Sequence, residues 1–206
     1  MNADMGMGTD QRPEGQGGAG RVQVAVVTGF DGLQQALAVR AAVFMGEHAT
    51  PYGREFDGND LTGTHILATV DGEPAGAMRI RYFGDFAMPE RLAVLPKFRA
   101  PAFAGNVALK LARQTFRFLG RKGFTRFYGR SLRDVLPFWT LFGAEPMEDG
   151  VFRIGGYECV AIAGVRKRPV DALTLHSGHL LLMRPEGQWD RPGVHDRAAG
   201  VAAPES

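Results

Sequence analysis

Two strand-like stretches flank the dipeptide Asp71-Gly72, and this arrangement constrains the fold of the 206-residue chain more than any other feature. Residues 64–70 (THILATV) precede the dipeptide, and residues 74–83 (PAGAMRIRYF) follow it. An Asp-Gly pair between two such runs favours the tight turn that joins antiparallel neighbours. The sequence therefore predicts an antiparallel hairpin, and with it a fold built around a sheet.

Helical periodicity supplies the second layer of the fold. Apolar residues recur at helical spacing between Ala104 and Leu119 and predict a helix from Pro101 to about Gly120. Asp31 is a candidate N-cap for an earlier helix from about Gly32 to Glu47, which a loop over 48–63 follows. The remaining elements are a short helix over 134–142 and strands over 21–30, 86–95, 124–131, 150–154 and 157–165. The order βαβββαβαββ predicts a mixed α/β domain with one central sheet.

The chain divides into three segments by composition. Residues 1–20 are rich in Gly, Asp and Gln and are expected to be a disordered tail. Residues 21–165 hold the predicted elements and form the folded domain. Residues 166–206 form a C-terminal extension that is partly irregular, with one extra strand predicted at His179–Met183.

Composition excludes several classes of protein. The single cysteine, Cys159, cannot form an intramolecular disulfide and sits in an apolar run that favours a core position. No run of 18 apolar residues predicts a membrane span, and no apolar signal core precedes residue 20, so the cytoplasm is the expected location. The five histidines and the cysteine lack the spacing of a metal site, including the pair His176 and His179.

Net charge is only +2, but basic residues are concentrated in one part of the chain. No acidic residue interrupts the run Lys110, Arg113, Arg117, Arg121, Lys122, Arg126, Arg130 and Arg133. The run is either a solvated helix face followed by a strand edge, or a face that attracts a nucleotide phosphate or an acidic carrier protein. Low net charge and the absence of an aromatic platform argue against a nucleic-acid partner.

Two motifs resemble those of the GCN5-related N-acetyltransferase (GNAT) superfamily. The first is Glu90–Arg99 (ERLAVLPKFR) followed by the helix from Ala104, which resembles the family pattern ERLAV-x-P-x-x-R. The second is Pro137–Ala144 (PFWTLFGA), which resembles the family's FY-x-x-x-GF helix. The resemblance covers about residues 22–165. It implies the GNAT fold, a mixed and mostly antiparallel central sheet flanked by helices.

The resemblance also implies a donor site for acyl-CoA or an acyl-phosphopantetheine. The amides of Leu92, Ala93 and Val94 would hold the pantetheine and polarise the thioester carbonyl. The loop that leads into the helix would hold the pyrophosphate through Arg99, Ala102, Ala104 and Gly105, because a helix N-terminus offers free amide donors. Two departures stand out: Ala102 replaces the glycine of the family's loop, beside Pro101, and Trp139 stands where many members carry a tyrosine acid.

One branch of the superfamily fits these departures better. N-acylhomoserine lactone synthases and long-chain N-acyl amino acid synthases often lack the glycine loop and commonly take acyl groups from acyl carrier protein. The present chain resembles that branch in the order of a series of residues, namely Arg40, Phe44, Glu55, Asp57, Asp60, Arg79 and Glu90-Arg91. The resemblance implies an acyl carrier protein as a partner, which the basic run from Lys110 to Arg133 would attract.

The candidate chemistry is acyl transfer to an amine. Glu90 is the candidate general base, acting through a water, and Tyr128 is a substitute for the missing acid. Glu55, Asp57 and Asp60 would hold the acceptor's ammonium, while Arg40, Phe44 and Arg79 complete the acceptor site. The alternatives are structural: ion pairs between these arginines and the acidic loop, an ion pair for Glu90, and a half-buried strand position for Tyr128.

For other residues, the sequence leaves open whether the role is structural or functional. His65 begins a strand beside the acidic loop and is either structural or part of the site. A group of methionines and phenylalanines either lines an acyl pocket or packs in the core. This group comprises Phe44, Met45, Met78, Phe83, Phe86 and Met88.

The function that these features predict is an N-acyltransferase. It would move an acyl group from acyl carrier protein or acyl-CoA to the amine of a small acceptor such as an amino acid, without a metal. The alternatives are an acetyl-CoA-dependent N-acetyltransferase and a catalytically inactive GNAT-like binding module.

Overall fold

The computed structural model describes residues 20–99, 104–154 and 156–200. The predicted tail lies almost wholly outside them. The strands are β1 (Val22–Val26), β2 (Thr64–Val70), β3 (Glu73–Tyr82), β4 (Ala87–Val94), β5 (Arg126–Leu132), β6 (Glu145–Ile154) and β7 (Tyr157–Val165). The α-helices are α1 (Phe30–Arg40), α2 (Tyr52–Glu55), α3 (Ala104–Arg121), α4 (Leu136–Thr140), α5 (His179–Leu182) and α6 (Val194–Ala198). A π-helical segment η1 (Ala41–Glu47) extends α1, and 3-10 turns η2 (Pro96–Phe98) and η3 (Arg133–Val135) precede α3 and α4.

Seven strands form one sheet in the order β1-β2-β3-β4-β5-β7-β6. Every neighbouring pair is antiparallel except β4 and β5, which are parallel. Asp71 and Gly72 make the β2–β3 turn with φ values of 50° and 86°, which is the conformation that the predicted hairpin requires. The predicted fold class, a mostly antiparallel mixed sheet flanked by helices, is confirmed.

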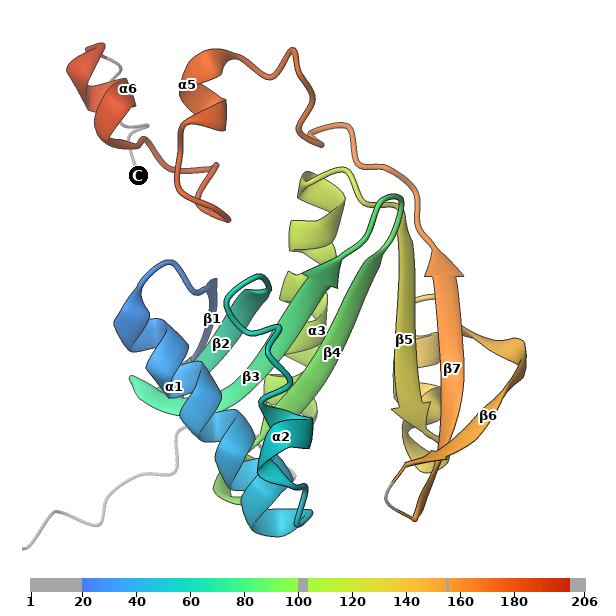
Figure 1. The fold of residues 1–206 in the computed structure, drawn as a ribbon. Helices are drawn as coiled ribbons and strands as arrows, with labels where there is room; N and C mark the ends of the chain where they lie inside the picture. The colour runs from blue at the N-terminus through green and yellow to red at the C-terminus, as the bar shows by residue number, and fades with distance from the viewer. Residues whose placement is uncertain (1–19, 100–103, 155, 201–206) are drawn as a thin grey trace, which may run out of the picture.

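Helices cover both faces of the sheet (Figure 1). The main core lies between α3 and the sheet, where the apolar stripe of α3 buries Val107, Leu111, Ala112, Phe116 and Leu119. A smaller core on the opposite face joins Ala36, Val39 and Val43 of α1 and η1 to Ala77 and Ala93 of the sheet. Both faces of β3 and β4 are therefore buried, and polar side chains there need internal partners.

Strands β4 and β5 pair at a single position, Ala87 with Phe127, near the start of both strands. Figure 1 shows the two strands diverging from that point. The edge of β4 beyond Ala87 therefore has no strand partner on the β5 side. An unpaired strand edge presents a row of backbone donors and acceptors.

A β-bulge interrupts the other edge of β4. Ala77 of β3 faces Ala93, whereas Arg79 faces Glu90, so β4 carries one more residue than β3 between these pairs. Arg91 adopts a left-handed conformation with φ 57°, which is uncommon for a residue with a side chain. The bulge redirects the chain so that Arg91 contacts Asp57 directly, while Glu90 is linked to Asp57 through Arg79.

The C-terminal extension packs on the domain, and it differs from the prediction. Residues 179–182 form the helix α5, so the predicted extra strand is wrong, and α6 lies in a stretch that was expected to be irregular. The continuous apolar run Leu180–Met183 was too short to distinguish a strand from a helical turn. Gly187, with φ 74°, lies against β1 so closely that a Cβ atom there would be 2.4 Å from a methyl of Val26.

The start of the chain's first helix also differs from the prediction. The helix begins at Phe30 with Gly29 as the N-cap, and Asp31 lies in the first turn, where its carboxylate accepts a hydrogen bond from Gln35 Nε2 at 2.8 Å. The predicted loop over 48–63 contains the single turn α2. These shifts move element boundaries without changing the order of the elements.

Candidate active site

Arg40 at the end of α1 is fully buried and is held by two carboxylates. Its Nη2 lies 2.7 Å from Glu55 Oε1, and its Nη1 lies 2.5 Å from Asp60 Oδ1. It also donates to the backbone carbonyl of Glu55 at 3.2 Å. The loop after η1 is thereby fastened to α1.

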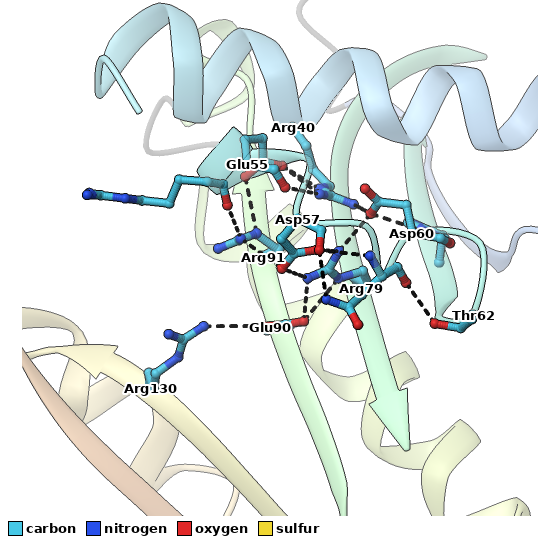
Figure 2. Close-up of polar contacts among 12 residues, drawn as sticks. Arg40, Glu55, Asp57, Asp60, Thr62, Arg79, Glu90, Arg91 and Arg130 are labelled. Atoms are coloured by element: carbon cyan, nitrogen blue, oxygen red, sulfur yellow. Dashed lines mark hydrogen bonds and ion pairs between the residues drawn. The ribbon is translucent and has the colours of Figure 1, made fainter. Parts of the chain in front are cut away.

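Arg79 on β3 contacts three carboxylates and has no exposed side-chain surface. Its two Nη atoms donate to the two oxygens of Asp57, each at 2.7 Å, a bidentate geometry. Glu90 Oε1 accepts from Arg79 Nη2 at 2.6 Å, and Asp60 accepts from Nη1 at 2.9 Å. Figure 2 shows Arg79 at the centre of this cluster.

Arg91 enters the same cluster from the bulge of β4. Its Nε lies 3.1 Å from Glu55 Oε2, and its Nη2 lies 3.3 Å from Asp57 Oδ2. The guanidinium also lies over the ring of Phe44, 5.9 Å from its centroid. The sequence analysis gave Arg91 no role of its own, although it directly follows Glu90.

Glu90 links the cluster to the gap between the diverging strands. Its Oε1 is occupied by Arg79, whereas its Oε2 accepts, among the described residues, only a long hydrogen bond of 3.4 Å from Arg130 on β5. The Glu90 side chain is 6% exposed and that of Arg130 is 35% exposed. Glu90 Oε2 is therefore the carboxylate oxygen through which the cluster contacts β5 (Figure 2).

The cluster is balanced in charge, because four arginines (Arg40, Arg79, Arg91 and Arg130) meet four carboxylates (Glu55, Asp57, Asp60 and Glu90). Hydrogen bonds from Arg79 hold the pKa of Asp57 well below its usual value. Burial raises the pKa of Asp60, but hydrogen bonds from Arg40 and Arg79 outweigh burial and lower that pKa overall. Burial dominates at Glu55 and raises its pKa despite Arg40 and Arg91.

His65 on β2 lies at the margin of the cluster and is 3% exposed. Its Nε2 is 2.9 Å from the carbonyl oxygen of Asp60, so Nε2 carries the proton that it donates. Its Nδ1 is buried and has no hydrogen-bond partner among the described residues. Burial lowers the pKa of His65, which keeps the ring neutral.

The predicted acceptor residues lie in one cluster, but their charged groups form ion pairs with one another. Arg40 and Arg79 have no exposed surface and are saturated by carboxylates, which is the alternative that the sequence left open. Phe44 is half-buried against the smaller core. Arg130, which the sequence analysis assigned only to the basic run, is the most exposed arginine of the cluster.

The predicted donor residues lie along β4 and at the start of α3. Leu92 is half-buried and Ala93 and Val94 are buried on the strand with the open edge. Arg99 follows η2, donates to the Val94 carbonyl at 2.7 Å, and forms a bidentate pair with Glu47 at 2.7 and 3.0 Å. Ala102 lies outside the described residues, and Ala104 and Gly105 begin α3.

Tyr128 and Trp139 flank the gap from different sides. Tyr128 is half-buried on β5, and its ring centroid lies 6.4 Å from that of Phe86 in an edge-on contact. Trp139 of α4 is buried and helps to line a cavity of about 10 Å³ with Pro89, Gly129 and Arg130. This cavity joins residues of β4 and β5 but has room for about one water molecule.

The candidate acyl-pocket residues divide between the core and the surface. Met78 and Met88 are buried, and Met78 accepts a hydrogen bond from Thr115 of α3 at 3.3 Å. Phe83 and Phe86 stack on each other at 4.7 Å beside the β3–β4 turn, and Phe83 is partly exposed. None of them lines the small cavity between β4 and β5.

Most of the basic run is neutralised by acidic partners. Arg121 lies 2.6 Å from Asp171, and Arg117 lies 3.1 Å from Asp190, so the C-terminal extension supplies these carboxylates. Lys122 pairs with Glu186 of the extension, while Arg126, Arg130 and Arg133 pair with Asp85, Glu90 and Glu158. Lys110 and Arg113 have no carboxylate partner among the residues that the structure describes.

Residues 20–99, 104–154 and 156–200 contain neither a cluster of metal-binding side chains nor a helix that could span a membrane. No group of three His, Cys, Asp or Glu side chains is arranged to hold a metal ion there. Nor does any helix in these ranges combine the length and apolar character needed to cross a bilayer.

Comparison with solved structures identifies the fold as that of the GNAT acetyltransferases. An assigned N-acetyltransferase from Lactobacillus plantarum superposes with a TM-score of 0.64 at 17% identity, covering 71% of this chain and 99% of that one. Escherichia coli ElaA gives 0.61 at 23% identity, covering 71% and 100%. An acyl-CoA N-acyltransferase from Pseudomonas aeruginosa gives 0.62 at 17%, covering 70% and 100%.

A sequence relative agrees with this class. Over 81 residues the chain is 36% identical to a provisionally assigned acetyltransferase of Bacillus subtilis. The match covers 38% of this chain and 55% of the Bacillus protein, so it spans about half of that relative's length. No protein-family model matches the chain.

Proposed function

We propose that this protein is an N-acyltransferase that moves a short acyl group from a pantetheine thioester to the amine of a small acceptor. The observation that carries the proposal is the open edge of β4, with Glu90 Oε2 facing it. The GNAT-like fold and the relatives named as acetyltransferases or acyltransferases support it.

The open edge of β4 suits an extended thioester arm. Pantetheine contains two amides in an extended chain, so it can add to a strand edge as a further strand would. The bulge at Arg91 and Leu92 turns backbone groups out of the β3 ladder. We assign to these backbone amides the role of polarising the thioester carbonyl.

Glu90 is assigned the role of general base. Oε2 would take a proton from the acceptor ammonium through a water, since Oε1 is held by Arg79. The free amine attacks the carbonyl carbon, the C–S bond breaks, and the electron pair leaves with sulfur. The nitrogen then loses its second proton, which the departing thiolate can accept. An ordinary thiol has a pKa of about 8.5, so a thiolate can leave near neutral pH without the acid that Trp139 cannot supply. Tyr128 remains the candidate that would protonate it.

Arg130 is assigned to the acceptor's carboxylate. An α-amino acid carries one positive and one negative group, which match Glu90 and Arg130 if the acceptor inserts between them. The long 3.4 Å contact and the 35% exposure of Arg130 support this role, whereas Arg40 and Arg79 are already saturated. Glu55, Asp57 and Asp60 would then fix the position of Arg79 rather than contact the acceptor.

The donor is assigned as acyl-CoA with a short acyl group. The cavity between β4 and β5 is about 10 Å³, which leaves no room for a long chain. The arginines and carboxylates that resemble the acylhomoserine lactone synthase branch lie together in one cluster, and this supports kinship with that branch. Lys110 and Arg113 have no carboxylate partner among the described residues, so they could attract an acidic carrier protein. An acyl carrier protein is therefore the second candidate donor.

The test is a thiol-release assay with acetyl-CoA, a long-chain acyl-CoA and an acylated carrier protein, each with a panel of amino acids. We expect acetyl-CoA to be the best donor and N-acyl amino acids to appear by mass spectrometry. Turnover with the carrier protein alone would reverse the donor assignment. No thioester cleavage with any donor would favour an inactive binding module.

A further inference from the structure

One cavity in the part of the chain that the structure describes lies away from the candidate active site. It has a volume of about 610 Å³ and lies between the second half of α3, the start of β5 and the C-terminal extension. Its walls include none of the eight charged residues of the Glu90 cluster. A cavity of this size is in the range that small-molecule ligands occupy.

The walls of this cavity are strongly positive. Seven lining residues are Lys or Arg, and two are Asp. Asp171 and Asp190 are already paired with Arg121 and Arg117 of α3. Four cations, namely Arg113, Arg166, Lys167 and Arg191, have no carboxylate partner among the described residues. The cavity therefore has positive charge that no described side chain neutralises.

One wall of the cavity is aromatic. Trp189 of the extension is 6% exposed and stacks on Phe118 of α3, with ring centroids 5.5 Å apart. The Arg166 guanidinium lies 5.0 Å from the centroid of the Phe116 ring and donates to the Phe142 carbonyl at 2.8 Å. This contact fixes Arg166 in the wall with other N–H donors remaining, as a guanidinium has five.

We propose that this cavity is a binding site for a small polyanion that carries several phosphate or carboxylate groups. Arg113 of α3 faces the space from the domain, and Arg191 faces it from the extension. A polyanion would bridge the two sides and fasten the extension to the domain beyond the ion pairs already present. The inference does not rest on acyl transfer, because the cavity shares no residue with the Glu90 cluster.

Tryptophan fluorescence can report on the site directly. The chain has two tryptophans, so Trp139→Phe leaves Trp189 as the single emitter. This variant is titrated with inorganic pyrophosphate, with citrate, and with sodium chloride at matched ionic strength. We expect a saturable change in emission and a rise in Tm with at least one polyanion, since a ligand that binds only the native state stabilises it.

Charge variants decide whether the response comes from this cavity. In Arg113→Gln, and separately in Arg191→Gln, the half-saturating concentration should rise about tenfold, because each change removes a charge-assisted contact. Lys110→Gln on the same helix, outside the lining, should leave it unchanged. A saturable response to pyrophosphate alone, or to citrate alone, would identify the preferred oxyanion. The proposal would be overturned if no anion gave a saturable response or if sodium chloride gave an equal response. It would also be overturned if Lys110→Gln raised the half-saturating concentration as much as Arg113→Gln or Arg191→Gln.

Discussion

Glu90 on β4 and Arg130 on β5 face each other across two strands that have separated, with Arg130 Nη2 3.4 Å from Glu90 Oε2. The ion pairs of Arg40 and Arg79 are shorter, and neither of these two arginines has exposed side-chain surface. This pair is therefore the point at which the cluster is easiest to open. The following predictions depend on that difference.

Replacing the candidate base should slow the reaction without unfolding the protein. Glu90→Gln keeps the shape of the side chain and its contact with Arg79 but cannot accept the proton. We expect kcat/KM to fall about a hundredfold or more. Glu145→Gln, at an exposed position on β6, is the matched control and should retain full activity. An unchanged rate in Glu90→Gln would remove Glu90 from the mechanism.

Replacing Arg130 should discriminate between acceptors. In Arg130→Gln, the KM for an amino acid should rise about tenfold, because one charge-assisted contact with the carboxylate is lost. The KM for the corresponding amino acid amide, which lacks the carboxylate, should change little. Equal effects on both acceptors would mean that Arg130 acts only through Glu90.

The buried arginines should matter for stability more than the exposed ones. Arg79→Met removes the partner of three carboxylates, one of which, Glu90, is buried, so we expect a loss of about 3–5 kcal/mol in the free energy of unfolding. Arg126→Met breaks an exposed pair with Asp85 and should lose less than about 1 kcal/mol. Urea denaturation followed by circular dichroism measures both. Similar losses would contradict the assigned role of Arg79 as the centre of the cluster.

The order of elements could be predicted from the sequence, because it depends on local patterns. The hairpin at Asp71-Gly72 and the stripe from Val107 to Leu119 are examples. The resemblance to the GNAT branch pointed to most members of the polar cluster, but not to Arg130. The sequence left open whether Arg79 pairs internally or binds the acceptor, and it could not predict the bulge that turns Arg91 into the cluster. The partners of the basic run were also missed, because Asp171, Glu186 and Asp190 lie far along the chain.

Acid should weaken the fold through His65 before it reaches the carboxylates. Burial lowers the pKa of this histidine from its ordinary 6.5. Between pH 6.5 and the lowered pKa of the folded state, the unfolded chain binds a proton at His65 and the folded chain does not. The contribution of neutral His65 to the free energy of unfolding is therefore fully present above pH 6.5 and declines as the pH falls toward the folded pKa. In His65→Gln, the free energy of unfolding should depend less on pH between about 6.5 and 5. The same slope in both proteins would exclude His65 as its source.

The account depends most on the edge of β4 that β5 leaves free. Hydrogen exchange measured by mass spectrometry, with and without acetyl-CoA, tests it without requiring turnover. We predict that the donor slows exchange in residues 88–94 and at the start of α3. An unchanged exchange rate in residues 88–94 at saturating acetyl-CoA would contradict the claim that this edge receives the thioester.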